Sequence, residues 1–387
     1  MRDNIFGLPR LAAAILAAAA ALARCGGGEG EKGAAAPVRF GVVLSTTGAA
    51  APYGIDNLRG LQVAQEYLNE QGGIHGRPVE LVVHDDAGEP AQAVALARRF
   101  AGDRRVTGIV GPTRTGTAVA VARVLPSLRI PMMSVGATGD WRAAAGEFNE
   151  WTFRSTRVDT YLIPPLLRTA RDSLGVRTVA IVSTGDDDWS RSTLAVYRQT
   201  LRELGMRLVA EETQMTGDAD RSAQLTRIRA AAPDALVINT LASDAPTIAD
   251  QARRMGIRAR FLGTAGFTTP QTWKLAGPGV LDGTLVADNY DPGSARPIVG
   301  EFIRRYRARF QADPPPYAAY AFDGLLLMAE AARRAPDPAD RRAVRDALGT
   351  IRDFEAVLGR VSYRGRGDAD KPAVVRQIQG SGVRQVP

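Results

Sequence analysis

The chain has 387 residues, of which 45% are hydrophobic and 23% are charged. This composition is that of an ordinary globular protein and excludes a disordered or fibrous one. Although 49 basic and 41 acidic residues give a net charge of +8, the arginines are scattered among acids; no concentrated phosphate-binding patch results, and we expect no nucleic-acid partner.

The N-terminus has the pattern of an export signal. Arg2 and Arg10 are followed by an apolar run of thirteen residues, 11–23. Such a run is shorter than the ~20 residues that span a bilayer, and it is typical of a signal peptide. We therefore interpret residues 1–24 as a signal peptide and residues 25–37 as a flexible tether to an exported body.

The end of this signal has two interpretations. Ala21-Leu22-Ala23 suits cleavage before Arg24, whereas Leu22-Ala23-Arg24-Cys25 resembles a bacterial lipobox, whose cysteine is lipidated. Cys25 is the only cysteine of the chain, and the Gly/Glu/Ala-rich segment after it suits a tether. We expect lipidation of Cys25 and a location in the periplasm or cell envelope.

From Val38 onward, short β-branched runs alternate with amphipathic segments. Predicted strands and helices alternate in the order 38–45, 54–73, 79–86, 90–103, 106–112, 115–128 and 130–137, beginning with a strand. Strands separated by helices pair in parallel through right-handed crossovers. The sequence therefore predicts a doubly wound α/β layer.

The same alternation restarts near Tyr161. Here predicted helices and strands alternate in the order 161–174, 177–184, 192–205, 207–214, 221–233, 235–241, 245–256 and 259–266, beginning with a helix. A strand over 284–290, helices over 297–310 and 318–335, and a β-rich tail follow. We predict two similar α/β lobes in series.

Motifs of common catalytic sites are absent from the sequence. It contains no GxxxxGK[ST] phosphate loop, no GxGxxG after the first strand, and no HExxH, CxxC or GxSxG. A hydrolase that uses paired carboxylates is the alternative that these absences leave open. We interpret the chain as a non-enzyme that needs no cofactor.

Both histidines lie in one short stretch with two acids, which could form a metal site. His75 falls in the turn before a predicted strand, and His84 lies near the end of that strand with Asp85 and Asp86. Such a strand spans ~23 Å, too far for both histidines to bind one ion. We therefore predict structural histidines and no metal site, and expect the two acids to cap the following loop and helix.

The segment from Tyr53 to Phe100 contains a recognisable order of motifs. A tyrosine-glycine pair opens the first helix, which ends in an Asn-x-x-GGI-x-G turn; a strand ending in Asp-Asp and a Pro-x-x-Ala-Val helix follow. This order resembles the Leu/Ile/Val-binding proteins of ABC importers. The segments IVGPTRTGTAVAVARVL and IPMMSVGAT resemble that family's next two ligand-side loops.

The resemblance implies a type I periplasmic-binding fold, with two doubly wound αβα lobes joined by a multi-crossover hinge. Lobe 1 would comprise residues 38–156 and 284–348, and lobe 2 residues 157–283 and 349–387. It implies a monomeric solute-binding protein that holds an amino acid, or a related small carboxylate or amide, between the lobes and delivers it to an ABC permease. A ligand sensor that feeds a receptor is the alternative.

Two loops are predicted to bind the ligand carboxylate. Thr115 and the run Gly136-Ala137-Thr138 follow strand ends, where open α/β sheets bind ligands, and offer hydroxyl and amide groups to an anion. The family places its substrate carboxylate at these loops. Ordinary helix capping is the alternative for Thr115.

The resemblance also assigns two aromatic residues and one rim charge. Tyr53 corresponds to the family's aromatic cover over the ligand, and Trp189 falls where relatives carry a tyrosine from the second lobe. Arg114, beside the carboxylate loop, is a candidate to help an anion enter.

One position departs from the amino-acid binders of this family. They carry an acid in the loop after the strand that corresponds to residues 259–266, and Ala265 holds that position here. Either Asp187, Asp188 or Asp244 pairs with the ligand ammonium instead, or the ligand has no amine.

Overall fold

The computed structural model describes residues 36–141, 149–363, 367–369, 371, 373–380 and 382–386. The predicted signal peptide, most of the tether and Cys25 lie outside these ranges. Among the described helices, none combines the length and the apolar character that crossing a bilayer requires.

The first sheet has five parallel strands in the order β2-β1-β3-β4-β5. They are β1 (Val38–Leu44), β2 (Val79–Asp85), β3 (Val106–Val110), β4 (Met132–Ser134) and β5 (Thr152–Arg154). Alternate side chains of β1 enter different core clusters, since Val42 packs with helices on one face and Val43 with helices on the other. This two-sided burial explains the continuous apolar run.

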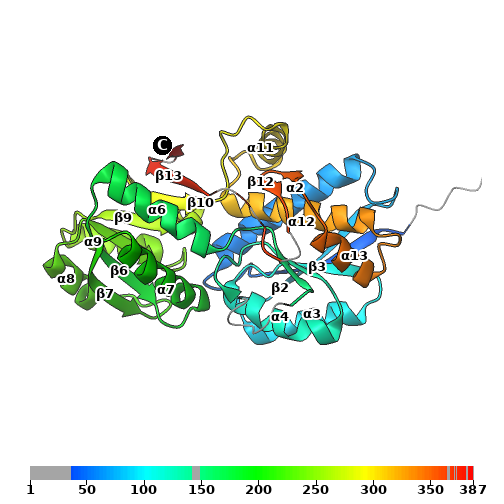
Figure 1. The fold of residues 1–387 in the computed structure, drawn as a ribbon, viewed down its shortest axis with the longest axis horizontal. Helices are drawn as coiled ribbons and strands as arrows, with labels where there is room; N and C mark the ends of the chain where they lie inside the picture. The colour runs from blue at the N-terminus through cyan, green and yellow to red at the C-terminus, as the bar shows by residue number, and fades with distance from the viewer. Residues whose placement is uncertain are drawn as a thin grey trace, which may run out of the picture. The chain divides into compact units, whose positions relative to one another are not determined.

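Helices cover both faces of this sheet (Figure 1). Helices α3 (Pro90–Gly102) and α4 (Thr115–Leu128) pack on one face, and α2 (Ala51–Glu70) and α12 (Pro316–Arg334) pack on the other. Helix α12 is buried almost all round, which explains its nearly continuous apolar sequence.

The second sheet has seven strands in the order β14-β13-β10-β9-β8-β6-β7. They are β6 (Thr178–Thr184), β7 (Arg207–Gln214), β8 (Ala235–Asn239), β9 (Arg260–Thr264), β10 (Leu285–Asp288), β13 (Val374–Gln379) and β14 (Gly382–Gln385). The strands from β6 to β10 are parallel, and β13 and β14 extend the sheet in antiparallel pairing.

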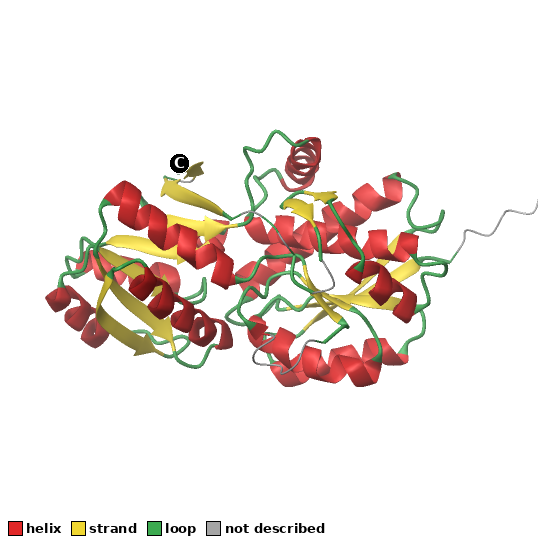
Figure 2. Ribbon diagram, in the orientation of Figure 1, coloured by secondary structure: helices red, strands yellow, loops and turns green. Residues whose placement is uncertain are grey.

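Helices cover both faces of the second sheet as well (Figure 2). Most helical residues of its two core clusters come from α6 (Asp159–Leu174) and α7 (Asp188–Glu203) on one face, and from α8 (Ser222–Ala231) and α9 (Ala245–Arg254) on the other. The predicted doubly wound α/β architecture with two lobes is therefore confirmed.

The remaining elements come either between β9 and β10 or between β10 and β13 in the chain. They are the 3-10 turn η1 (Ala265–Thr268), α10 (Pro270–Ala276), α11 (Pro297–Phe310), α13 (Arg341–Gly349), β11 (Phe354–Ala356) and β12 (Gly359–Val361).

The chain passes between the two sheets three times: after β5, after β10 and before β13. The second and third passages differ from the expected ranges. Strand β10 pairs with β9, so residues 285–288 belong to the second sheet and not to lobe 1. Ile351 and Tyr363 lie in the core cluster of the first sheet, because the β11–β12 hairpin packs against α12 there.

The structure also answers the question of the two histidines. His75 lies in a turn with φ of 51°, and His84 in β2 packs against the ring of Phe100 at 5.6 Å between centroids. Asp85 and Asp86 accept hydrogen bonds from backbone amides of the loops after β1 and β2. The predicted loop capping is confirmed, whereas neither acid caps α3, whose N-cap is residue 89.

The contact between α2 and α12 depends on Gly60, because a Cβ atom there would lie 2.0 Å from the carbonyl oxygen of Ala318. We expect Gly60→Ala to lower the free energy of unfolding by about 2–3 kcal/mol through overpacking. Gly300 in α11 is the matched control, since a Cβ there meets no atom within 4 Å. Gly300→Ala should raise stability by about 0.5–1 kcal/mol through helix propensity. Urea denaturation measures both, and equal stabilities of the two variants would contradict the close packing.

Candidate functional site

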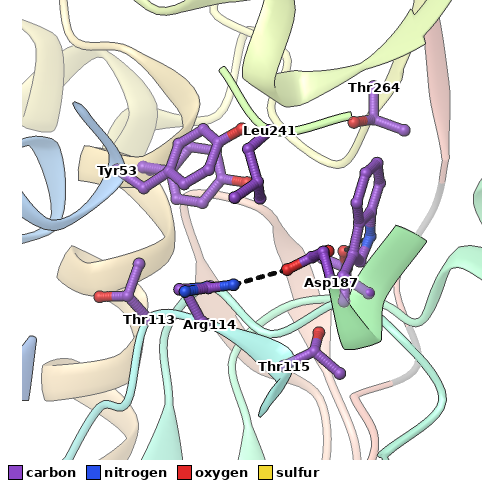
Figure 3. Close-up of a pocket in the computed structure, with 11 residues that line it drawn as sticks. Tyr53, Thr113, Arg114, Thr115, Asp187, Leu241 and Thr264 are labelled. Atoms are coloured by element: carbon purple, nitrogen blue, oxygen red, sulfur yellow. Dashed lines mark hydrogen bonds and ion pairs between the residues drawn. The ribbon is translucent and has the colours of Figure 1, made fainter. Parts of the chain in front are cut away.

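The carboxyl ends of strands from both sheets border one pocket. Its lining residues come from the end of β9, from loops after strands and from helices α2, α4, α7 and α12: Tyr53, Thr113, Arg114, Thr115, Gly136, Thr138, Asp187, Trp189, Leu241, Thr264 and Tyr317 (Figure 3). The enclosed space between these side chains is about 20 Å³, which is room for about one water molecule. An amino acid or small carboxylate therefore enters only if the lining side chains move apart.

All of the predicted ligand residues except Ala137 line this pocket. Ala137 is buried, and its carbonyl accepts a hydrogen bond from Arg154 Nη1 at 3.2 Å. Its neighbours Gly136 and Thr138 remain on the pocket wall. These residues follow different strands in the sequence and lie in one pocket, as expected for the carboxyl ends of parallel strands. Their contact with a ligand stays a prediction.

The start of α4 forms the polar floor on the first lobe. Thr115 is the first residue of this helix, and Arg114 is its N-cap, with no side-chain cap hydrogen bond. The hydroxyl of Thr115 accepts a hydrogen bond from the amide of Gly139 at 3.3 Å, so this residue does not cap the helix, contrary to the alternative interpretation. Amide groups of the first turn therefore remain available, with the positive end of the helix dipole, for an anion.

An ion pair links this floor to the second lobe. Arg114 Nη2 donates to Asp187 Oδ2 at 2.7 Å (Figure 3). Arg114 Nη1 donates to the carbonyl of Gly88 at 3.2 Å. Asp187 also caps α7, since its Oδ1 accepts the amide of Ser190 at 2.9 Å. The side chain of Asp187 is 3% exposed and that of Arg114 is 21% exposed. Such a pair is costly to break, because removal of either partner leaves a poorly solvated charge.

Aromatic side chains form the apolar wall. The ring of Tyr53 stacks on Tyr317 of α12, with 4.4 Å between centroids and 18° between planes. The backbone amide of Ala242, in the loop after β8, donates to the Tyr53 hydroxyl at 2.5 Å. Burial raises the pKa of Tyr53 far above its usual value, so the hydroxyl stays protonated and can itself donate.

Trp189 of α7 also lines the pocket and is fixed by two acceptors. Its Nε1 donates to Thr138 Oγ1 at 3.1 Å and to Asp159 Oδ2 at 2.7 Å. The first bond joins the second lobe to the loop after β4. Tyr53 and Trp189 thus both line the pocket, and each is held by a hydrogen bond, while their contact with a ligand stays a prediction.

Asp159 is the buried group behind Trp189 that the sequence did not indicate. It is 1% exposed, and within the described residues its Oδ1 has no hydrogen-bond partner. Burial raises the pKa of Asp159 to about 7, although hydrogen bonds from Thr138 and Trp189 act in the opposite direction. The carboxyl is thus mostly protonated below neutral pH.

No group of three or more His, Cys, Asp or Glu side chains with metal-binding geometry occurs in the part of the chain that the structure describes. Among the described residues, the pocket therefore offers a ligand hydrogen bonds and apolar contacts, and its two charged side chains, Arg114 and Asp187, neutralise each other.

Comparisons of the sequence identify a family and several relatives. Residues 37–383 match the family described as periplasmic binding protein. The Leu/Ile/Val-binding protein homolog 1 of Brucella melitensis is 28% identical over 341 residues, which cover 88% of this chain and 90% of that protein. The Leu/Ile/Val-binding protein BraC3 of Rhizobium johnstonii is 26% identical over 333 residues, covering 86% and 89%.

Solved structures show the same fold. The leucine-binding protein LivK of Thermotoga maritima superimposes with a TM-score of 0.84 at 24% identity, covering 90% of this chain and 98% of that one. LivJ of Streptococcus pneumoniae, solved in complex with isoleucine, gives a TM-score of 0.82 at 24% identity, covering 90% and 99%.

The raised pKa of Asp159 makes stability depend on pH. The carboxyl has a pKa of ~3.9 when unfolded, so the folded state binds more protons between about pH 4 and 7. The stability that the neutral Asp159 carboxyl gives the folded state is fully present below pH ~4 and is lost as the pH rises through 7. Asp159→Asn cannot ionise, and we expect this variant to gain stability relative to wild type by up to ~1.4 kcal/mol for each pH unit in this window.

Urea denaturation at several pH values measures this difference. Asp56 has a pKa raised to about 7 in the same way, but it is present in both proteins and cancels in the comparison. Asp172→Asn is the control, because this exposed acid has its pKa lowered by Arg171, and its profile should follow wild type from pH 4 to 7. Parallel profiles of wild type and Asp159→Asn would show that burial does not hold the carboxyl neutral.

Proposed function

The chain belongs to the periplasmic binding protein family, and from this premise we propose that it is the exported solute-binding protein of an ABC importer of the branched-chain amino acid type. The proposed ligand is an amino acid or a related small carboxylate or amide. The names of the relatives, which are Leu/Ile/Val-binding proteins, support the substrate class. No catalytic role is proposed, because relatives in this family are named for binding.

The observation that carries the proposal is the pocket at the strand ends of both sheets. The first turn of α4 offers amides and the hydroxyl of Thr115 to a carboxylate, while Tyr53 and Trp189 offer apolar faces to the rest of the ligand. A ligand that touches groups from both lobes favours the closed arrangement by its binding energy, and a permease can recognise that arrangement. Because one chain supplies both walls, a monomer is sufficient.

The proposal also includes the location. An exported protein that serves a permease must stay near the membrane, and lipidation of Cys25 would hold it there through the tether of residues 26–37. Periplasm or cell envelope is therefore the proposed site of action.

A binding screen tests the function. Isothermal titration calorimetry with leucine, isoleucine, valine, small aliphatic and aromatic carboxylates, and amides should identify at least one ligand. Small-angle scattering should show that this ligand makes the protein more compact. Absence of heat and of compaction across the whole panel would contradict the proposal.

Thr115→Val tests the carboxylate floor with the tightest ligand of that panel. The variant removes one hydroxyl and keeps the shape, so we expect about tenfold weaker binding, which corresponds to ~1.4 kcal/mol for a lost hydrogen bond. Thr350→Val is the matched control, since that exposed hydroxyl at the end of α13 donates only to the carbonyl of Ala347. Unchanged affinity in Thr115→Val would remove this residue from the site.

Cys25→Ser tests the anchor. When the full chain is expressed in a lipidating bacterial host, wild type should partition into the detergent phase of Triton X-114, and Cys25→Ser should move to the aqueous phase. Arg24→Ala is the control, because it keeps the cysteine and should stay with the detergent. Wild type in the aqueous phase, with Arg24 as its first residue, would favour ordinary cleavage instead.

A further inference from the structure

We propose that the ligand of this pocket is a small carboxylate with an apolar body and without an ammonium group. This inference rests on the proposed function, since it concerns the same pocket, and it narrows the substrate class. It follows from how the acidic side chains around the pocket are already engaged.

Three acids are candidates to pair with a ligand ammonium in place of an acid at position 265. Two of them, Asp188 and Asp244, do not face the pocket. Asp188 forms an ion pair with Arg191 on the same helix, and its side chain is 48% exposed. Asp244 is buried and accepts from Arg221 Nη2 at 3.1 Å and from Gln214 Nε2 at 3.2 Å. Neither acid lines the pocket. Asp244 serves contacts within the second lobe, whereas Oδ2 of Asp188 lies beside the first turn of α4, 2.5 Å from where a Cβ atom of Gly116 would be.

Asp187 is the one acid among the described residues that line the pocket. Both of its oxygens are engaged, Oδ1 by the amide of Ser190 and Oδ2 by Arg114. Because Arg114 lines the same pocket, the formal charge of these lining side chains sums to zero. A ligand ammonium would have to share one carboxylate with a guanidinium, and the two cations would repel each other in a poorly solvated space.

The first turn of α4, next to this ion pair, favours an anion. The first turn of α4 has no side-chain cap, and Arg114 Nε is buried without a hydrogen-bond partner among the described residues. A carboxylate near this turn would receive amide donors, the helix dipole and the adjacent guanidinium. Unpaired donors at this turn can therefore receive an anion, whereas no unpaired acid among the described residues that line the pocket can receive an ammonium.

Matched pairs of compounds distinguish recognition of a carboxylate from recognition of an ammonium. We expect wild type to bind 4-methylpentanoate at least tenfold more tightly than leucine, and 3-phenylpropanoate at least tenfold more tightly than phenylalanine, by calorimetry at pH 7.5. The members of each pair share carbon skeleton and carboxylate and differ in the ammonium. Equal or tighter binding of either amino acid overturns the inference and leaves the proposed function in place. Binding of no amino acid, carboxylate or amide contradicts both.

A charge variant tests the cause. Arg114→Gln keeps a polar side chain but removes the cation, which frees Asp187 to pair with an ammonium. We expect the affinity ratio of leucine to 4-methylpentanoate to rise at least tenfold, even if both compounds bind more weakly. Arg114→Lys is the control, because it keeps the charge and should keep the wild-type ratio. An unchanged ratio in Arg114→Gln, with native circular dichroism, would show that the ion pair does not exclude the ammonium.

Discussion

The direction of the strands determines where everything else in this protein can lie. In both sheets the strands adjacent to the pocket are parallel, so their carboxyl ends and the N-termini of the following helices meet at one edge of each sheet. The loops there carry Thr115, Thr138 and Asp187, while the opposite edges carry turns such as the one that holds His75. Chemistry is thereby concentrated at one place, and the rest of each sheet is free to be an apolar core.

Polar contacts made by side chains of the pocket join the two lobes at this edge. They connect Arg114 with Asp187, Tyr53 with Ala242, and Trp189 with Thr138. Each uses a side chain that also lines the pocket, so a ligand can enter only by adding to these contacts or by replacing them. The affinity for a ligand then reflects the difference between the contacts that the ligand makes and the contacts between the lobes that it replaces.

Much of the fold was predictable, because its long elements carry strong periodicity and clear ends. Helix α4 begins and ends as predicted, as does α11, which starts at a proline. Strand β5 and helices α10 and α13 were not predicted, because a few residues carry little periodic signal. At the site, the strand-end rule identified Thr115 and Thr138. It could not identify Tyr317 or Asp159, whose places depend on tertiary packing far from the loops.

The three passages of the chain have a consequence for how the protein is made. The first sheet needs α12 to cover one of its faces, and Ala318 of that helix lies against Gly60 of α2. During synthesis the first lobe therefore cannot complete its core until nearly all of the second lobe has left the ribosome. Late closure of distant contacts slows folding, and a polypeptide that is slow to fold stays longer in the extended form that a translocation channel can thread.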